Sequence, residues 1–238
     1  MGCSEEVDQN PEILVFAAAS LVDVMMENAA AFEDQSDTKI AFSFGGSQML
    51  AQQIASGAPS DVFISAGQFP IDFLNQRELI DQSVLDLVAN SLVVAIRAND
   101  IGLQSIEQLS EDVVGRVAIA DPKLSPAGRY AREALINLGL WDDLAGRIVP
   151  AVNVRVALAY VESGNADAAL VYRTDVGLAP DLYSLDIVPS ESHAPIIYGS
   201  AVVRSSSKKT EAGEFIAFLG SREAKQVFLK HGFQPMRQ

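Results

Sequence analysis

The sequence predicts an α/β protein with two lobes, each a mostly parallel sheet flanked by helices. Strand-like and helix-like patterns alternate along most of the 238 residues, which is typical of parallel strands joined by helices. No internal repeat or low-complexity linker interrupts the alternation, and the length suits one or two domains. Apolar segments near 92–96 and 198–203 are the expected crossings between the lobes. We therefore expect 12–92 with 200–238 to form lobe 1, and 93–199 to form lobe 2.

The individual elements follow from the spacing of apolar residues. Short apolar or alternating runs predict strands at 13–16, 40–44, 61–65, 92–96, 117–120, 168–172 and 196–203. Apolar residues at helical spacing predict helices at 21–32, 48–56, 69–75, 126–138 and 154–163. The segment 211–231 carries two more helices, which separate near Gly220.

Composition argues against several kinds of partner. The net charge of −14 disfavours nucleic acid. The single cysteine, Cys3, excludes an internal disulfide, and the two histidines, His193 and His231, lie far apart in the sequence. The chain has no HExxH, CxxC or EF-hand pattern, so we expect no metal held by His or Cys ligands and no cofactor.

Small residues recur where a predicted strand ends and a helix begins. These junctions are at Ser20, Ser47, Ala127 and Val154. The first N–H groups of a helix have no intrahelical partner and lie at the positive end of the helix dipole. Several such ends facing one cleft would bind an anion without Lys or Arg, despite the negative net charge. The alternative is ordinary N-capping by serine, with small residues selected by packing alone.

Seven segments in order resemble the periplasmic molybdate-binding proteins of bacterial ABC importers. They span nearly the whole chain after residue 12: VFAAASL (15–21), FGGSQMLAQQI (44–54), GAPSDVFISA (57–66), NSLVVAI (90–96), DPKLSPAGRYAREAL (121–135), NVRVALAYVESGNADAALVYRTD (153–175) and EAKQVFLKHGF (223–233). The resemblance implies a type II periplasmic-binding-protein fold with the ligand in a cleft between the lobes. It also implies high-affinity binding of molybdate and tungstate, and delivery of the ion to the membrane permease of an ABC importer.

The resemblance also implies a set of ligand-binding residues. In this chain they are Ser20, Ser47, Ala127, Val154 and Tyr172, which would contact the oxygens of the oxyanion and not the metal atom. Tyr172 is carried over from the VYRTD segment alone; by itself it would be a half-buried tyrosine at a strand end. A binding protein for another tetrahedral oxyanion, such as sulfate, is the main alternative, because it needs only a different cavity size.

Some residues depart from the family's pattern or invite another role. Gly67 stands where the family usually has an acid, and Asn153 where aspartate is common, which leaves Val154 less securely assigned. Either Arg155 or Asp175 could form an ion pair behind the site, and either could equally be a surface charge of little effect. Asp61 is expected to cap or brace a turn and receives no ligand role.

Two other classes of function are weaker. Neither Ser20 nor Ser47 has a histidine in its motif, no GxSxG elbow is present, and FGGSQ lacks the GK[ST] ending of a phosphate loop. An enzyme on the same scaffold is thus the less favoured alternative. A regulator's sensing domain would carry a basic helix-turn-helix segment at one end, whereas the N-terminus here is short and acidic.

The first residues predict a tether. Residues 1–11 are polar and acidic, as in a flexible leader. Cys3, followed by Ser4 and two glutamates, resembles the start of a mature bacterial lipoprotein from which the signal segment has been removed; an incidental cysteine is the alternative. We expect a monomer in the periplasm or on the outer face of the cytoplasmic membrane, with a lipid anchor at Cys3.

Overall fold

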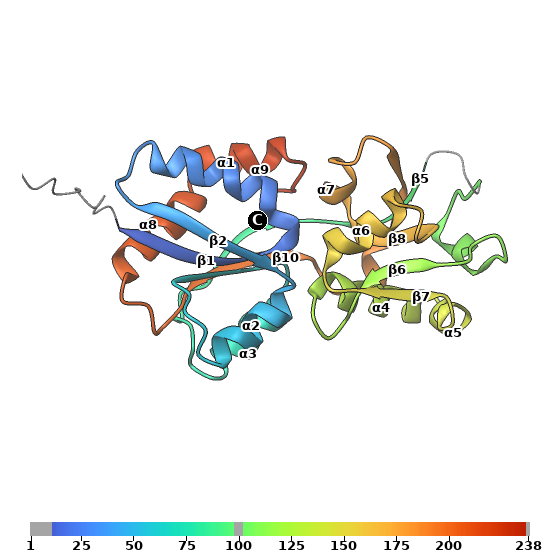
Figure 1. The fold of residues 1–238 in the computed structure, drawn as a ribbon, viewed down its shortest axis with the longest axis horizontal. Coiled ribbons are helices and arrows are strands. Elements are labelled where there is room, and N and C mark those ends of the chain that lie inside the picture. Colours follow the sequence, from blue (N-terminus) through green and yellow to red (C-terminus); the bar gives the residue numbers. More distant parts are fainter. Residues whose placement is uncertain (1–10, 98–101, 237–238) are drawn as a thin grey trace, which may run out of the picture.

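The computed structural model describes residues 11–97 and 102–236 and contains two five-stranded sheets. The lipid anchor predicted at Cys3 lies outside the described residues. The two sheets form separate lobes that lie side by side, with the chain passing between them twice (Figure 1). We refer to the lobe that contains β1 as lobe 1 and to the lobe that contains β6 as lobe 2.

Lobe 1 is built on the sheet β2-β1-β3-β10-β4. Its strands are β1 (Glu12–Ala18), β2 (Lys39–Gly45), β3 (Val62–Ser65), β4 (Leu85–Ala89) and β10 (Ile197–Val202). Its helices are η1 (Ala19–Leu21), α1 (Val22–Glu33), α2 (Ser47–Ala55), α3 (Gln68–Asn75), α8 (Lys209–Leu219) and α9 (Arg222–Lys230). Helices α1 and α9 cover one face of the sheet, and α2 and α3 lie on the other (Figure 1).

Lobe 2 is built on the sheet β7-β6-β8-β5-β9. Its strands are β5 (Leu92–Arg97), β6 (Val117–Ala120), β7 (Ile148–Ala151), β8 (Ala168–Tyr172) and β9 (Leu182–Ile187). Its helices are η2 (Ile106–Ser110), α4 (Pro126–Asn137), α5 (Trp141–Leu144), α6 (Val154–Glu162), α7 (Arg173–Val176) and η3 (Ser190–Ser192). Helices α6 and α7 lie on one side of this sheet, and α4 and α5 on the other (Figure 1).

Both sheets are mixed, which refines the expectation of mostly parallel sheets. In lobe 1, β10 runs antiparallel to β3 and β4; in lobe 2, β5 runs antiparallel to β8 and β9. The other pairings are parallel. The reason lies in the connections. β5 and β10 follow the two crossings, so each begins at the junction between the lobes and runs away from it. Strands such as β1 and β6 run in the opposite direction and end at the junction.

The crossings lie just before the predicted crossing strands. β5 lies wholly in lobe 2, where Leu92 pairs with Tyr172, and β10 lies wholly in lobe 1. The chain therefore crosses at 90–91 and again within 188–196. Leu92 and residues 197–199 thus lie on the other side of the lobe boundaries expected from the sequence.

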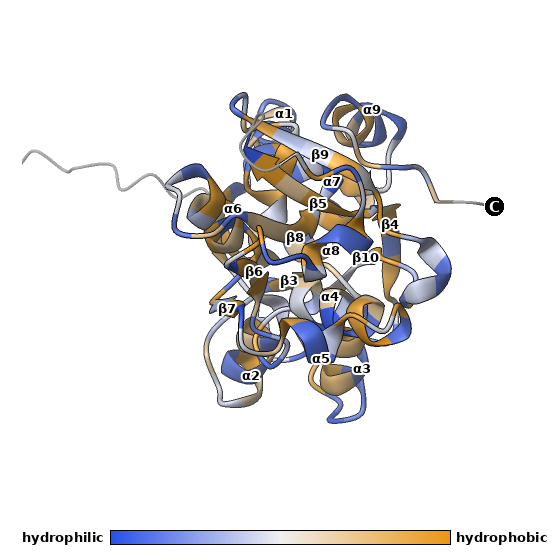
Figure 2. Ribbon diagram, turned by 90° about the vertical axis from the view of Figure 1, so that its right-hand side faces the viewer, coloured by the Kyte–Doolittle hydropathy of each residue, from blue (hydrophilic) through white to orange (hydrophobic). Residues whose placement is uncertain are grey.

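Strands and the inner faces of the helices together supply the buried apolar core. The central strands are strongly hydrophobic, and hydrophilic residues gather on the outer faces of the helices (Figure 2). One cluster of buried residues runs through both lobes, and a smaller one lies between the lobe 1 sheet and helices α2 and α3. Within the described part of the chain, no helix has both the length and the hydropathy needed to cross a bilayer.

Candidate functional site

The predicted site residues lie where the strands of both lobes end at the junction between them. β1 leads into η1, β2 into α2, β6 into α4 and β7 into α6. Ligands of open α/β sheets bind beyond the carboxyl ends of the strands, where helices begin. Because the two lobes present these ends to each other, helix N-termini from both lobes meet at one place.

Ser20 lies in η1 and is buried. Its Oγ is 2.9 Å from the hydroxyl of Tyr198, on β10. The amide of Asn90, in the first crossing segment, donates to the Tyr198 hydroxyl at 3.2 Å and to Thr174 Oγ1 of lobe 2 at 2.9 Å. Burial raises the pKa of Tyr198 well above its ordinary value, so its hydroxyl keeps its proton. Ser20 therefore belongs to a neutral hydrogen-bond network that joins the lobes.

Ser47 and Tyr172 both bond to the backbone of one residue of lobe 1, Ala66. Ser47 is the first residue of α2, and its buried Oγ accepts a hydrogen bond from Ala66 N at 3.1 Å. Tyr172, at the end of β8 in lobe 2, donates from its hydroxyl to Ala66 O at 3.4 Å. Burial raises the pKa of Tyr172 well above its ordinary value. The tyrosine is therefore a neutral donor at any physiological pH.

Ala127 and Val154 lie in the first turns of α4 and α6, and both are buried. The N-cap of α4, Ser125, makes no side-chain capping bond, so the first amides of α4 receive none from it. The N-cap of α6, Asn153, accepts from Val156 N at 3.0 Å. The side chain of Asn153 thus caps the third residue of the helix and leaves the amide of Val154 to other partners.

The two lobes approach each other closely at Gly46. A Cβ built on this residue would lie 2.3 Å from Leu124 O and 3.2 Å from Val152 O, two carbonyls that precede α4 and α6. The N–H of Met49 also donates to Leu124 O, at 3.2 Å. η1 packs against α6 in the same region. The structure therefore brings Ser20, Ser47 and Tyr172 to the junction that also contains the starts of α4 and α6.

Of the two possibilities left open for Arg155 and Asp175, the structure shows an ion pair, and the two residues pair with each other. Arg155 Nε lies 2.7 Å from Asp175 Oδ1, and the side chain of Asp175 is completely buried. Oδ2 of the same carboxylate accepts from Tyr172 N at 3.3 Å. Burial raises the pKa of Asp175 to about 7, against the opposing effect of Arg155. The pair lies behind Tyr172 and fixes its backbone.

Asp61 braces a turn, as expected from the sequence. Its Oδ2 accepts from Leu14 N at 2.8 Å, and its Oδ1 accepts from Ser206 Oγ at 2.6 Å. These bonds tie the start of β3 to β1 and to the segment after β10. Asp61 is thus a structural residue of lobe 1.

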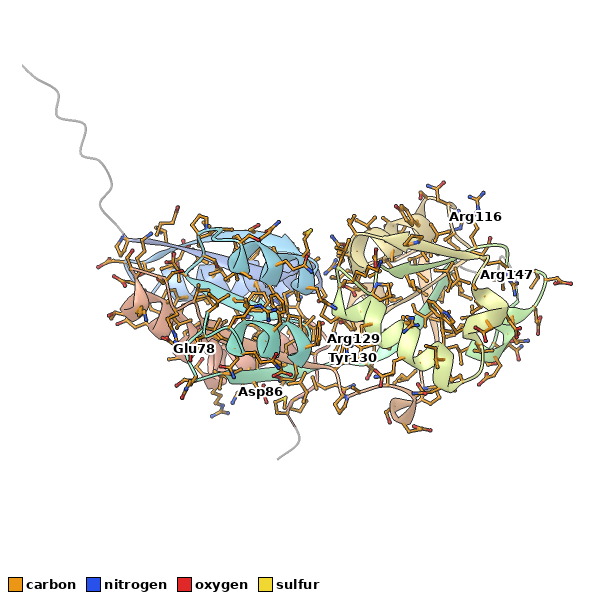
Figure 3. The ribbon with its side chains drawn as sticks, turned by 90° about the horizontal axis from the view of Figure 1, so that it is seen from below. Glu78, Asp86, Arg116, Arg129, Tyr130 and Arg147 are labelled. Atoms are coloured by element: carbon orange, nitrogen blue, oxygen red, sulfur yellow. The ribbon has the colours of Figure 1, made fainter. Side chains whose placement is uncertain are left out.

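Two arginines of lobe 2, Arg129 and Arg147, already have partners within the protein. Arg129 and Tyr130 lie where the lobes face each other, whereas Arg116 and Arg147 lie toward the far end of lobe 2 (Figure 3). The guanidinium of Arg129 stacks on the ring of Phe69, 4.1 Å from its centroid. Arg147 donates to backbone carbonyls of its own lobe. The predicted ligand residues at the junction offer hydroxyls and backbone amides, and the guanidinium of Arg155 is paired with Asp23 and Asp175.

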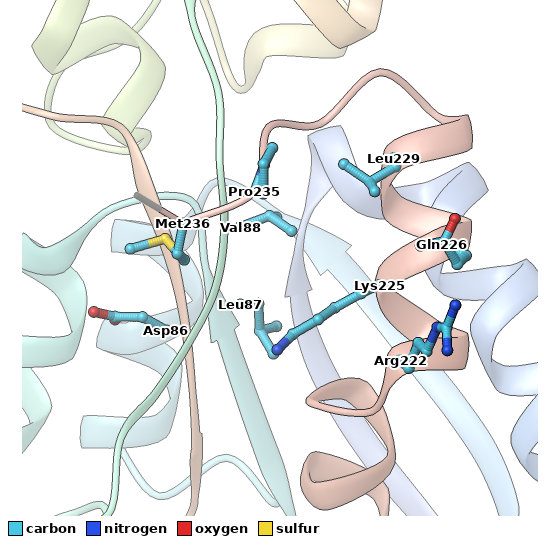
Figure 4. Close-up of a pocket in the computed structure, with 9 residues that line it drawn as sticks. All are labelled: Asp86, Leu87, Val88, Arg222, Lys225, Gln226, Leu229, Pro235 and Met236. Carbon is cyan, nitrogen blue, oxygen red and sulfur yellow. The ribbon is translucent and has the colours of Figure 1, made fainter. Parts of the chain in front are cut away.

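One hollow outside the junction belongs to a single lobe. A groove of about 550 Å³ lies between β4 and α9, within lobe 1 alone, and is lined largely by apolar side chains (Figure 4). Among the described residues, no group of three or more His, Cys, Asp or Glu side chains could hold a metal ion. His231 pairs with Glu27 at 2.8 Å.

Sequence reasoning missed three residues that support the site. Tyr198 bonds to Ser20 and accepts in turn from Asn90, and the backbone of Ala66 joins Ser47 to Tyr172. Tyr198 interrupts an apolar strand with a hydroxyl, which was the only local signal. Asn90 and Ala66 carry no such signal, because their partners are distant in the sequence.

Comparison with known proteins gives a consistent result. The family model described as bacterial extracellular solute-binding protein matches residues 13–234. The molybdate-binding protein ModA of Escherichia coli (strain K12) is 37% identical over 228 residues, covering 93% of this chain and 88% of that protein. The Bacillus subtilis (strain 168) protein named "Putative ABC transporter substrate-binding lipoprotein YvgL" is 33% identical over 240 residues, covering 98% and 92%.

Similarity to a solved structure provides evidence about the fold only. The periplasmic molybdate-binding protein of Azotobacter vinelandii superposes with a TM-score of 0.86, covering 94% of this chain and all of that one, at 23% identity. The arrangement of two lobes around a junction is therefore shared with a solved periplasmic binding protein.

Proposed function

The chain belongs to the bacterial extracellular solute-binding protein family, and we propose that it binds molybdate and tungstate for an ABC importer. Members of this family are transport components and not enzymes. Near-full-length similarity to ModA of Escherichia coli supports molybdate as the ligand. The proposed ligand set is Ser20, Ser47, Ala127, Val154 and Tyr172, through three hydroxyls and backbone amides.

One observation carries the proposal: neutral donors from both lobes meet in a buried junction. Ser20 and Ser47 contribute from lobe 1, and Tyr172 contributes from lobe 2, with its pKa raised by burial. Fixed dipoles at helix starts and protonated hydroxyls stabilise an anion without a charged side chain. A site of this kind can bind a dianion even in a protein whose net charge is −14.

Such a site selects among oxyanions by protonation and by size. Molybdate and tungstate at neutral pH present only acceptors, which suits a site of donors. Phosphate near pH 7 carries a proton that would have no acceptor, and an unsatisfied buried polar group costs about 1–3 kcal/mol. Sulfate is smaller, so it would reach fewer of the donors at once. We therefore expect molybdate and tungstate to bind more tightly than sulfate, and phosphate least.

Closure of the lobes would present the bound ion to the permease. Two lobes joined by two crossing segments can close as a hinge, and closure excludes water from the site. The membrane subunits of an ABC importer would recognise the closed form. The lipoprotein name of YvgL supports the expectation of a tether at Cys3 on the outer face of the cytoplasmic membrane.

Isothermal titration of the dialysed protein tests the proposal. Molybdate, tungstate, sulfate and phosphate are injected in turn at pH 7.5. One-to-one binding of molybdate and tungstate, at least a hundredfold tighter than that of sulfate, is the expected result. Equal affinity for sulfate would reassign the ligand and keep the site, whereas no heat from any oxyanion would refute the proposed function.

A further inference from the structure

Arg155 connects the two lobes through a single guanidinium group. It is the second residue of α6 in lobe 2 and directly follows Val154. Its Nη2 lies 2.7 Å from Oδ2 of Asp23, on α1 in lobe 1, and its Nε lies 2.7 Å from Oδ1 of Asp175, on α7 in lobe 2. The contact with Asp23 has the geometry of a hydrogen bond. In the contact with Asp175 the N–H of Nε does not point at the carboxylate oxygen, so this attraction is mainly Coulombic.

The two halves of this arrangement differ in burial. The Asp175 side chain is 0% exposed and belongs to the same lobe as Arg155, so this half persists whether the lobes are together or apart. The Asp23 side chain is 43% exposed and belongs to the opposite lobe. An exposed ion pair is usually weak because both side chains must be ordered. Here Asp175 already orders Arg155, which lowers the entropy cost of pairing with Asp23.

The chain places these three residues next to the proposed ligands. Arg155 adjoins Val154, Asp175 accepts from the backbone N of Tyr172, and Asp23 follows Ser20 by three residues. None of the three is a proposed contact of the oxyanion. Any separation of lobe 1 from lobe 2 lengthens the bond between Arg155 and Asp23, since the two residues are held by different sheets.

We propose that Arg155 and Asp23 form a closing contact that retains the bound oxyanion by holding the lobes together, an inference that rests on the proposed function. Arg155 is a positioning residue, and Asp175 is its anchor. The ion enters while the lobes are apart, when the contact is absent, and leaves only after the contact breaks. The contact therefore slows dissociation and has little effect on association.

The test uses Asp23→Asn, which removes the negative charge that lobe 1 offers to Arg155 and leaves the buried pair of Arg155 and Asp175 intact. Release of radiolabelled molybdate from the full-length protein is followed after a chase with unlabelled ion. We expect the dissociation rate to rise about fivefold at low salt, as for a solvent-accessible charge-assisted bond, and the association rate to change less than about twofold. The difference should shrink as salt is added. Asp23→Glu should restore slow release.

Asp81→Asn is the matched control. Asp81 pairs with Lys209 within lobe 1 at 3.6 Å, and its side chain is 39% exposed, so this variant removes the same charge from a comparable surface pair. It should release molybdate at the wild-type rate. Equal release by the wild type and Asp23→Asn, or equal acceleration by Asp81→Asn, would overturn the closing contact while the binding function stands. A wild-type protein that retains no oxyanion would overturn the proposed function, and the closing contact with it.

Discussion

Gly46→Ala should block closure of the lobes without harming either lobe. Gly46 has φ −67° and ψ 128°, a conformation that alanine adopts freely, so the substitution causes no local strain. The added Cβ would instead lie 2.3 Å from Leu124 O, across the junction. An ordinary contact needs about 3.4 Å, so the lobes must stay about 1 Å further apart at this point.

A separation of about 1 Å is enough to break hydrogen bonds from lobe 2 to an ion held by lobe 1. A bond of about 2.9 Å becomes one of about 3.9 Å, which is no longer a hydrogen bond. Each bond to a charged group contributes about 1.5–3 kcal/mol. Loss of one or two such bonds should raise the dissociation constant for molybdate at least about tenfold.

Titration calorimetry measures the affinity, and thermal unfolding without ligand measures the folding of the lobes. Gly46→Ala should unfold within about 2 °C of the wild type, because its clash exists only in the closed form. Gly213→Ala is the control: its Cβ meets nothing within 4 Å, so it should bind molybdate normally. Binding by Gly46→Ala within threefold of the wild type would refute the closure reasoning.

Three further predictions concern individual side chains. Tyr172→Phe removes a buried neutral donor and should weaken molybdate binding about 10- to 100-fold by calorimetry, with unchanged affinity counting against its role. Ser47→Ala also frees the N–H of Ala66 from its partner; it should weaken binding about tenfold, and an unaltered isotherm would remove Ser47 from the ligand set. The pKa of Asp175 is raised from 3.8 to about 7, so the stability it contributes is full below pH 4 and is lost as pH rises through 7. Relative to Asp175→Asn, the wild type should lose about 2–3 kcal/mol of unfolding free energy between pH 5 and pH 8 in urea titrations, and parallel pH profiles would contradict this.

The strands that the sequence did not predict are all at sheet edges. β4, β7 and β9 are the edge strands missed, and β7 contains Pro150 while β4 carries an exposed aspartate at Asp86. Edge strands tolerate charges and proline because one side of their backbone has no partner strand. Their patterns therefore resemble those of loops, whereas the buried central strands were recognisable from apolar runs.

The residues of the candidate site also divide into those that a local pattern predicts and those that it does not. The helix starts near Ser20 and at Ser47 and Val154 could be predicted, because turn-forming and small residues at the end of a strand are local signals. The role of Tyr198 could not, because its hydroxyl reaches Ser20 from a residue 178 positions away. The direction of β10 was also hidden, since it depends on which lobe the chain leaves before the strand begins.

The ion pair of Arg155 and Asp175 could be predicted only in part. The two charges were visible in the sequence, but a surface location was equally consistent with them. The packing of α7 against α6 and against strands β5, β8 and β9 buries Asp175 fully, and burial raises its pKa. Burial of a polar group depends on tertiary contacts, which a local pattern does not encode.

A crystal structure of the protein with molybdate would test the central claim most directly. We expect one oxyanion at the junction of the lobes, within hydrogen-bond distance of the hydroxyls of Ser20, Ser47 and Tyr172. The backbone amides of Ala127 and Val154 should complete the contacts, with no Lys or Arg touching the ion. An oxyanion bound by a cationic side chain, such as Arg129, or bound within a single lobe would contradict the account.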